Sequence, residues 1–326
     1  MKRLTFSLCV AALTVFASAA SAEILIKFSH VVSADTPKGR GAEIFKQKVD
    51  ERLAGKVRVE VYPSSQLYND NDVLKALLLG DAQMAAPSLS KFGKYTRSYG
   101  VFDLPFLFKN TAAVECFTEG PKGKELLKAM EDKGYTGLAY WLNGMKQISA
   151  NTPLLVPTDA EGLKFRIMTS DVLEAQFEAL EANPQKMAFA EVYNSLQTGV
   201  IDGQENTWSN IYSKKFFEVQ EHFTESNHGV LEYLVVTSTE FWNSLPDDIR
   251  AELEAILTET TAEVTEIALA KADEDKQKVV DSGATTVHQI DDAQLAQWQE
   301  AMKPVWDEFE GEIGKDVIDA AIACNG

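Results

Sequence analysis

Residues 24–30, ILIKFSH, alternate after a β-branched start and predict a β-strand. Residues 35–53 follow as a predicted helix with a proline in its first turn. Residues 57–62, VRVEVY, alternate as a second strand, residues 73–79 form a second predicted helix closed by a glycine, and residues 83–86 form a short buried strand. The order strand, helix, strand, helix, strand predicts the parallel βαβ units of an α/β fold.

Polar residues follow the predicted strands where a ligand would bind. In parallel sheets, ligands sit beyond the carboxyl ends of the strands. His30 ends the first strand, Lys38 lies at the start of the next helix, and Ser88 and Ser90 follow the third strand. The sequence therefore places these four residues near a candidate pocket.

A second run of elements repeats this pattern. Residues 136–141, 163–168 and 231–236 predict strands, and residues 171–180 and 191–197 predict helices. Because the α/β pattern occurs twice, we expect two lobes.

Residues 246–282 form the longest segment with apolar residues at helical spacing. A single helix of about 35 residues would be roughly 50 Å long. That length exceeds one lobe, so the helix is expected to brace both. The alternative is two helices with a break near residues 258–261. Residues 293–322 are predicted to be mostly helical, with a kink or division at Pro304.

The first residues predict export. Lys2 and Arg3 precede a short apolar run over residues 4–16, and residues 20–22, Ala-Ser-Ala, supply the small side chains of a signal-peptidase site. A membrane anchor or a buried helix is the alternative, but spanning a bilayer takes roughly 20 apolar residues. We therefore expect residues 1–22 to be a signal peptide cleaved after Ala22, and the mature chain to be periplasmic.

Charge and cysteine content restrict the partners. Without residues 1–22, Lys and Arg fall from 31 to 29 while Asp and Glu stay at 49, so the net charge is about −20. Nucleic acid is not expected as a partner, because phosphate binding needs clustered basic residues. An anionic ligand must be held by local positive charge. Cys116 and Cys324 remain in an oxidising compartment, where a disulfide and two free thiols are both open.

Catalytic and metal-binding motifs are missing from the sequence. It contains no G-x-S-x-G elbow, no G-x-G-x-x-G after a strand, no phosphate-loop lysine and no H-E-x-x-H, and it has only four histidines. We therefore expect no enzyme, no metal and no cofactor. Arg166 instead lies inside an apolar strand-like run, where a guanidinium can grip a carboxylate in a two-bond fork. An internal bridge to Asp or Glu is the alternative.

Eleven collinear motifs carry a family resemblance. They are FSHVV at 28–32, DTPKG at 35–39, YPSSQL at 62–67, APSL at 86–89, FDLPF at 102–106, WLNG at 141–144, LKFR at 163–166, MAFAEVY at 187–193, LQTG at 196–199, DGQEN at 202–206 and SNH at 226–228. On these motifs nearly the whole mature chain resembles the periplasmic binding proteins of tripartite ATP-independent periplasmic (TRAP) transporters. It is most similar to the DctP-type C4-dicarboxylate binders.

The resemblance implies roles for individual residues. Arg166 matches the arginine that grips the ligand carboxylate, Asn206 the asparagine that orients it, and Phe189 an aromatic pocket wall. Lys38 resembles the second positive group of the dicarboxylate branch. Lys146 stands where the sialic-acid branch has a second arginine, and a lysine there argues against sialic acid.

Five weaker candidates complete the implied site. Ser88, Trp141 and Asn210 are pocket candidates for which simple packing is the alternative. His30 and His228 are candidate liners, for which a hydrogen-bonded structural histidine is the alternative. In the family a proline commonly follows the asparagine, where this chain has a threonine.

The resemblance also implies an architecture and a partner. We expect the two-lobe periplasmic binding protein fold, which closes over its ligand by hinge motion. Lobe 1 would comprise residues 23–146 plus 232–262, and lobe 2 residues 147–231 plus 263–326. The expected ligand is a small organic acid such as malate, succinate or fumarate, with a 2-oxo acid or sugar acid as the alternative. The expected partner of this monomer is a TRAP membrane permease with small and large subunits. A periplasmic acid-processing enzyme and a sensor-linked binding protein are the rival functions.

Overall fold

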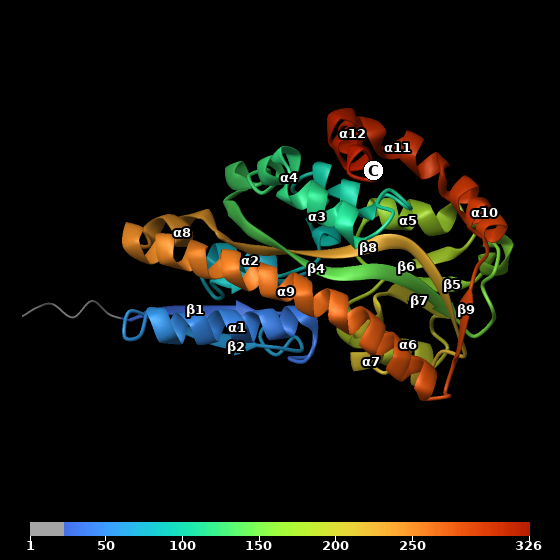
Figure 1. The fold of residues 1–326 in the computed structure, drawn as a ribbon, viewed down its shortest axis with the longest axis horizontal. Helices are drawn as coiled ribbons and strands as arrows, with labels where there is room; N and C mark the ends of the chain where they lie inside the picture. Colours follow the sequence, from blue (N-terminus) through green and yellow to red (C-terminus); the bar gives the residue numbers. More distant parts are fainter. Residues whose placement is uncertain (1–22) are drawn as a thin grey trace, which may run out of the picture.

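The computed structural model describes residues 23–326, so the expected signal peptide and its cleavage site lie outside the described residues. The described chain forms a nine-stranded mixed sheet covered by helices (Figure 1). The strands are β1 (Ile24–Ser29), β2 (Val57–Tyr62), β3 (Met84–Ala85), β4 (Tyr135–Ala150), β5 (Lys164–Ile167), β6 (Asn183–Lys186), β7 (Gly203–Asn206), β8 (His222–Ser238) and β9 (Thr286–Gln289). This confirms the predicted α/β class.

The helices connect these strands and cover both faces of the sheet. The α-helices are α1 (Pro37–Arg52), α2 (Val73–Leu79), α3 (Thr111–Glu119), α4 (Pro121–Leu126), α5 (Asp171–Glu178), α6 (Val192–Gln197), α7 (Trp208–Ser213), α8 (Thr239–Ser244), α9 (Asp247–Asp281), α10 (Asp292–Met302), α11 (Pro304–Ile313) and α12 (Lys315–Ala323). Short 3-10 turns are η1 (Leu89–Phe92), η2 (Ser98–Asp103), η3 (Glu131–Lys133), η4 (Pro157–Ala160), η5 (Phe189–Glu191) and η6 (Phe216–Glu218). The division expected at Pro304 is confirmed, because this proline begins α11.

Two long strands join the two lobes. The sheet order is β2-β1-β3-β8-β4-β7-β5-β6, so β4 and β8 stand between the parallel units at either end. They pair antiparallel from Tyr135 opposite Ser238 to Ala150 opposite His222. Their register shifts between Leu142 and Gly144, and Gly144 has a φ of 131° that other residues rarely adopt. Such irregularities bend a strand locally, so the pair bends where the lobes meet.

Helix α9 braces the molecule. It runs unbroken for 35 residues, so the two-helix alternative is wrong. Its apolar stripe, including Leu253, Ile256 and Val264, is buried. The helix packs against α1 in one lobe, α7 in the other and β4 between them. Among residues 23–326, no helix combines the length and apolar character needed to cross a membrane.

A disulfide fixes the C-terminus. Cys116 on α3 and Cys324 after α12 are bonded, with their Cα atoms 5.6 Å apart and a separation of 208 positions in sequence. The sequence left a disulfide and two free thiols both open, and the structure shows the disulfide. Because α12 packs on α3 and η2 while α11 also contacts α5, the C-terminal helices touch elements of both expected lobes.

Removing this disulfide should destabilise the fold. A cross-link that closes a long loop restricts the unfolded chain, so the Cys116→Ser/Cys324→Ser variant should lose about 2–5 kcal/mol of unfolding free energy. Denaturant unfolding, with and without reductant, measures this loss. Each single variant should lose about as much as the double variant, and unchanged stability of the reduced wild-type chain would contradict the expectation.

Candidate functional site

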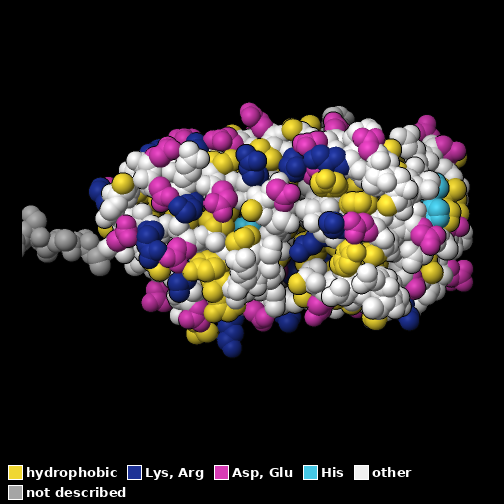
Figure 2. Space-filling view, turned by 90° about the horizontal axis from the view of Figure 1, so that it is seen from below, with side chains coloured by type: hydrophobic (Ala, Val, Ile, Leu, Met, Phe, Trp, Pro, Cys, Tyr) yellow, Lys and Arg dark blue, Asp and Glu magenta, His cyan; other side chains and the backbone are white. Residues whose placement is uncertain are grey.

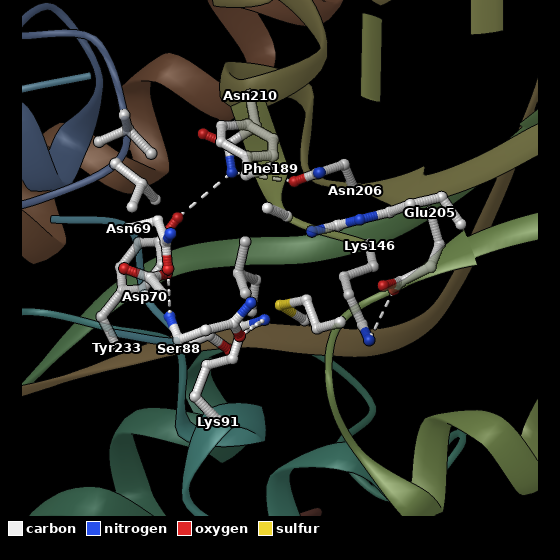
Figure 3. A pocket seen from close by; sticks show the side chains of 17 residues that line it. Asn69, Asp70, Ser88, Lys91, Lys146, Phe189, Glu205, Asn206, Asn210 and Tyr233 are labelled. Carbon is white, nitrogen blue, oxygen red and sulfur yellow. Dashed lines mark hydrogen bonds and ion pairs between the residues drawn. The ribbon is translucent and has the colours of Figure 1, made fainter. Parts of the chain in front are cut away.

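A cavity of about 510 Å³, counted out to its open mouth, lies between the lobes. Its lining comes from both ends of the sheet: Val31, Val32, Asn69, Asp70, Asn71, Ser88, Lys91, Lys146, Arg166, Met168, Ala188, Phe189, Glu205, Asn206, Asn210, Leu231 and Tyr233. Figure 2 shows a hollow near the middle of one face, with basic side chains at it. Figure 3 shows Asn206 and Asn210 on one side of the cavity and Asp70, Ser88 and Lys91 on the other.

Arg166 is the buried cation of the second lobe. It lies on β5 and is 2% exposed. Its Nε and Nη2 both donate to the backbone oxygen of Met187, at 3.1 and 3.0 Å. Among residues 23–326 no carboxylate forms an ion pair with it, so the internal-bridge alternative is wrong for this state. Burial lowers the pKa of the guanidinium to about 10, against the raising effect of Glu205 and Asp70, so it remains charged at neutral pH.

Asn206 is oriented by its neighbours. It ends β7, where its Oδ1 accepts from the backbone amide of Thr207 at 3.1 Å and from Nδ2 of Asn210 at 2.9 Å. Asn210 Nδ2 also donates to the hydroxyl of Tyr233 at 3.2 Å. These bonds hold the oxygen of Asn206. Its amide Nδ2 donates no hydrogen bond within residues 23–326, so it is available to an acceptor in the cavity. The ring of Phe189 forms a wall with its centroid 5.8 Å from Cζ of Arg166.

Lys146 is already paired inside the protein. Its Nζ lies 2.6 Å from Oε2 of Glu205, and both side chains are at most 1% exposed. Nε2 of His228 lies 3.6 Å from the same oxygen, and Nδ1 shares a hydrogen bond with Ser226 Oγ at 2.7 Å. Burial alone would raise the pKa of Glu205, but Lys146 and His228 outweigh it and hold that pKa at about 2. The charge of Lys146 is therefore largely compensated at the cavity wall.

Lys91 is a cation of the cavity that the sequence reasoning did not select. It lies on η1, and its Nζ donates to Asn71 Oδ1 at 3.0 Å and Thr169 Oγ1 at 3.3 Å. These two acceptors belong to opposite lobes. Burial lowers the pKa of Lys91 to about 8, with Arg166 contributing and Asp70 and Asp103 opposing. A lysine just after Ser88 and Ser90, beyond the third strand, was the available signal.

Lys38 stands behind the cavity rather than on its surface. It is fully buried, and its Nζ donates to the backbone oxygen of Ala86 at 2.8 Å. The same nitrogen lies 3.6 Å from the ring centroid of Tyr233, which does line the cavity. Burial lowers the pKa of Lys38 to about 8, with Asp70 opposing. Lys38 can therefore act on a ligand only by packing against Tyr233 in the cavity wall and by its electric field.

Three further candidates also lie outside the lining. Trp141 is buried in the core, stacked on Phe28 with centroids 5.7 Å apart, and its Nε1 donates to Thr261 Oγ1. His30 is 1% exposed, and burial together with Lys38 lowers its pKa to about 3, so it is neutral at neutral pH. Burial also lowers the pKa of His228. The cavity surface itself collects Ser88, Lys146, Arg166, Phe189, Asn206 and Asn210 from the predicted set.

The lining carries more positive than negative charge. Lys91, Lys146 and Arg166 face two carboxylates, those of Asp70 and Glu205. Because Lys146 and Glu205 neutralise each other, Arg166 and Lys91 stand against the single carboxylate of Asp70, and Lys38 adds positive charge from behind the wall. Two separated cations in a cavity between lobes suit a small ligand with two anionic ends. No arrangement of a nucleophile with its base is found among the lining residues.

Comparison with known proteins shows which family shares this sequence and fold. The profile of bacterial extracellular solute-binding protein family 7, DctP, matches residues 28–312. The C4-dicarboxylate-binding periplasmic protein DctP of Shewanella loihica is 58% identical over 300 residues, which are 92% of this chain and 89% of that protein. Two crystal structures of TRAP periplasmic solute-binding proteins are also similar. That of Shewanella oneidensis with bound succinate is 55% identical, with a TM-score of 0.93 over 94% of this chain and 100% of that chain.

The second is the TRAP periplasmic solute-binding protein of Pseudomonas aeruginosa with bound L-malate. It is 47% identical, with a TM-score of 0.86 over 87% of this chain and 99% of that chain. Both the profile match and the curated relative extend over most of the chain. The chain belongs to the DctP family, family 7 of the bacterial extracellular solute-binding proteins, whose members are binding proteins and not enzymes.

Proposed function

We propose that this chain captures a C4-dicarboxylate such as succinate, malate or fumarate in the periplasm and delivers it to a TRAP membrane permease. The observation that carries the proposal is the buried guanidinium of Arg166, which faces the cavity without a carboxylate partner. An unpaired buried charge is costly, and an anionic ligand removes that cost. Succinate and L-malate bound to the two related structures support the same ligand class.

The first ligand carboxylate binds in the second lobe. Arg166 donates to one of its oxygens from the nitrogen that Met187 leaves free, and Asn206 donates its Nδ2 to the carboxylate. Phe189 covers the guanidinium and excludes water, which strengthens the charge-assisted hydrogen bonds. Asn210 contributes by holding the oxygen of Asn206 away from the ligand.

The second ligand carboxylate pairs with Lys91. This lysine lines the cavity, whereas Lys38 has its ammonium committed to Ala86 and Tyr233. Lys91 thus replaces Lys38 as the second positive group that the family resemblance implied. Lys38 supports the site by fixing Tyr233 and by adding positive potential.

Ligand capture is coupled to lobe closure. We place the lobes at residues 23–146 plus 232–262 and 147–231 plus 263–326, with the bend of β4 and β8 as the hinge. A diacid that contacts Arg166 and Lys91 binds the closed form better than the open one, and this difference in affinity drives closure. We propose that it acts as a monomer in this cycle.

Arg166→Ala should abolish dicarboxylate binding while the chain stays folded. Loss of one partner of a buried charge pair costs roughly 2–5 kcal/mol of affinity. Arg166→Lys should also bind poorly, because an ammonium lacks the planar set of donors that holds the Met187 oxygen on one edge and reaches the ligand from another. Calorimetric titration with succinate measures both, and circular dichroism checks folding. Wild-type affinity in folded Arg166→Ala would remove the basis of the proposal.

Two carboxylates should bind much better than one. Butyrate satisfies Arg166 but leaves Lys91 unpaired, so succinate should bind at least ~100-fold tighter, equivalent to about 2.7 kcal/mol. Lys91→Gln should lower the ratio of succinate affinity to butyrate affinity by weakening succinate binding. Lys38→Gln should lower this ratio less. The exposed neighbour Lys94 provides the matched control, Lys94→Gln, which should leave the ratio unchanged. Equal binding of butyrate and succinate by the wild-type chain would point to another small carboxylate, such as a sugar acid.

Export and processing complete the proposed role. We propose cleavage after Ala22, so the mature chain should begin at Glu23, the first described residue. Intact-mass measurement of the protein from a periplasmic extract checks this. An uncleaved chain, or one cut elsewhere, contradicts it.

A further inference from the structure

A second hollow lies across β8 from the cleft. Leu231 and Tyr233 line the cleft, whereas Glu232 between them lines the other hollow, because successive strand residues point to opposite faces. This groove is bounded by α3, α4, β4, β8 and α9 and has a volume of about 1370 Å³ counted out to its open mouth. Figure 1 shows α9 running beside β4, with α3 and α4 above them.

The groove has an apolar wall with one buried acid. The apolar lining residues are Val114, Leu127, Leu138, Ala139, Tyr140, Leu142, Ala262 and Leu269. Glu232 is 3% exposed, and its Oε2 has no hydrogen-bond partner among residues 23–326. Burial, with a contribution from Glu115, raises the pKa of Glu232 well above its usual value and so favours the protonated carboxyl. A buried carboxyl left without a partner is costly unless a ligand or water satisfies it.

The rim of the groove is acidic. Glu115 and Glu119 project from α3 and Glu266 from α9, against the single basic lining residue Lys124 on α4. Hydroxyl groups of Thr258, Thr261 and Thr265 on α9 also line it. Burial and Glu119 raise the pKa of Glu115, which adds a second carboxyl whose ionisation is disfavoured. Negative potential over an apolar wall favours a cation that carries a hydrocarbon chain.

We propose that this groove is a binding site for a primary alkylammonium ion, which pairs with Glu232 and lays its chain against the apolar wall. Binding ionises the acid: the carboxyl proton leaves to solvent, and the carboxylate accepts hydrogen bonds from the intact ammonium group. One proton is released for each ion bound. The site is separate from the dicarboxylate cleft and does not depend on the function proposed for it.

The probe is n-hexylammonium, titrated calorimetrically into the full mature protein at neutral pH. Repeating the titration in buffers of different ionisation enthalpy gives the number of protons exchanged. We expect saturable binding with release of close to one proton per hexylammonium, and tighter binding as the pH rises towards the pKa of Glu232 in the free protein. Hexanol, which keeps the chain but lacks the charge, should bind more weakly and release no proton.

Variants separate this site from the rest of the molecule. Glu232→Gln keeps the shape of the side chain but cannot ionise, so it should lose at least ten-fold in affinity and all of the proton release. Glu266→Gln removes a rim charge and should weaken binding slightly with the proton release unchanged. Arg166→Ala alters the cleft and should leave hexylammonium binding unchanged.

Three results would overturn the proposal. They are the absence of saturable binding to the wild-type chain at millimolar hexylammonium, binding without proton release, and equal binding by folded Glu232→Gln. Loss of binding in Arg166→Ala would place the amine in the cleft and also overturn it. If Glu232→Gln fails to fold, as judged by circular dichroism, the number of protons released per hexylammonium bound to the wild-type chain still tests the proposal.

Discussion

The antiparallel pairing of β4 with β8 is the constraint on which the two-lobe arrangement depends. The pair stands between β2, β1 and β3 on one side and β7, β5 and β6 on the other. The pair bends at its register shifts near Gly144, and the cavity opens beside that bend. In the hinge motion that we propose, the two lobes would rotate about this bend. Helix α9 and the Cys116–Cys324 bond also connect elements of the two proposed lobes.

Within this frame the charges of the cleft have two different roles. Lys146, Glu205 and His228 form a buried set in which the charges of the lysine and the glutamate offset each other at the wall. Arg166 and Lys91 are held only by neutral oxygen acceptors. Neutral acceptors orient a cation without cancelling its charge, so the cleft keeps a positive potential inside an acidic protein. That potential is local because water screens distant charges over about 10 Å at 0.1 M salt.

Much of this architecture could be predicted because periodicity is a local property of the chain. The βα units, the unbroken α9 and the break at Pro304 all follow from spacing and proline chemistry. Arg166 could also be predicted as a site residue, because a cation buried inside an apolar strand is costly unless it has a partner. Side-chain direction could not be predicted: Lys38 begins the first predicted helix and Trp141 ends a predicted strand, yet neither side chain lines the cavity. Nor could sequence spacing predict that Lys91 meets Thr169 from the other lobe, 78 residues away.

The alternation of β8 links the cleft to the groove on its far side. Tyr233 faces the cleft and receives Lys38 on its ring, while Glu232 faces the groove and carries an unsatisfied oxygen. When Glu232 ionises, its charge lies one residue from Tyr233 in the wall of the cleft, and only the backbone of β8 separates the two. In the proposed hinge motion β8 is one of the two strands that bend, so an ion bound to Glu232 would lie on that strand. The two-residue period of the strand thus sets a buried acid directly behind the wall of the proposed anion site.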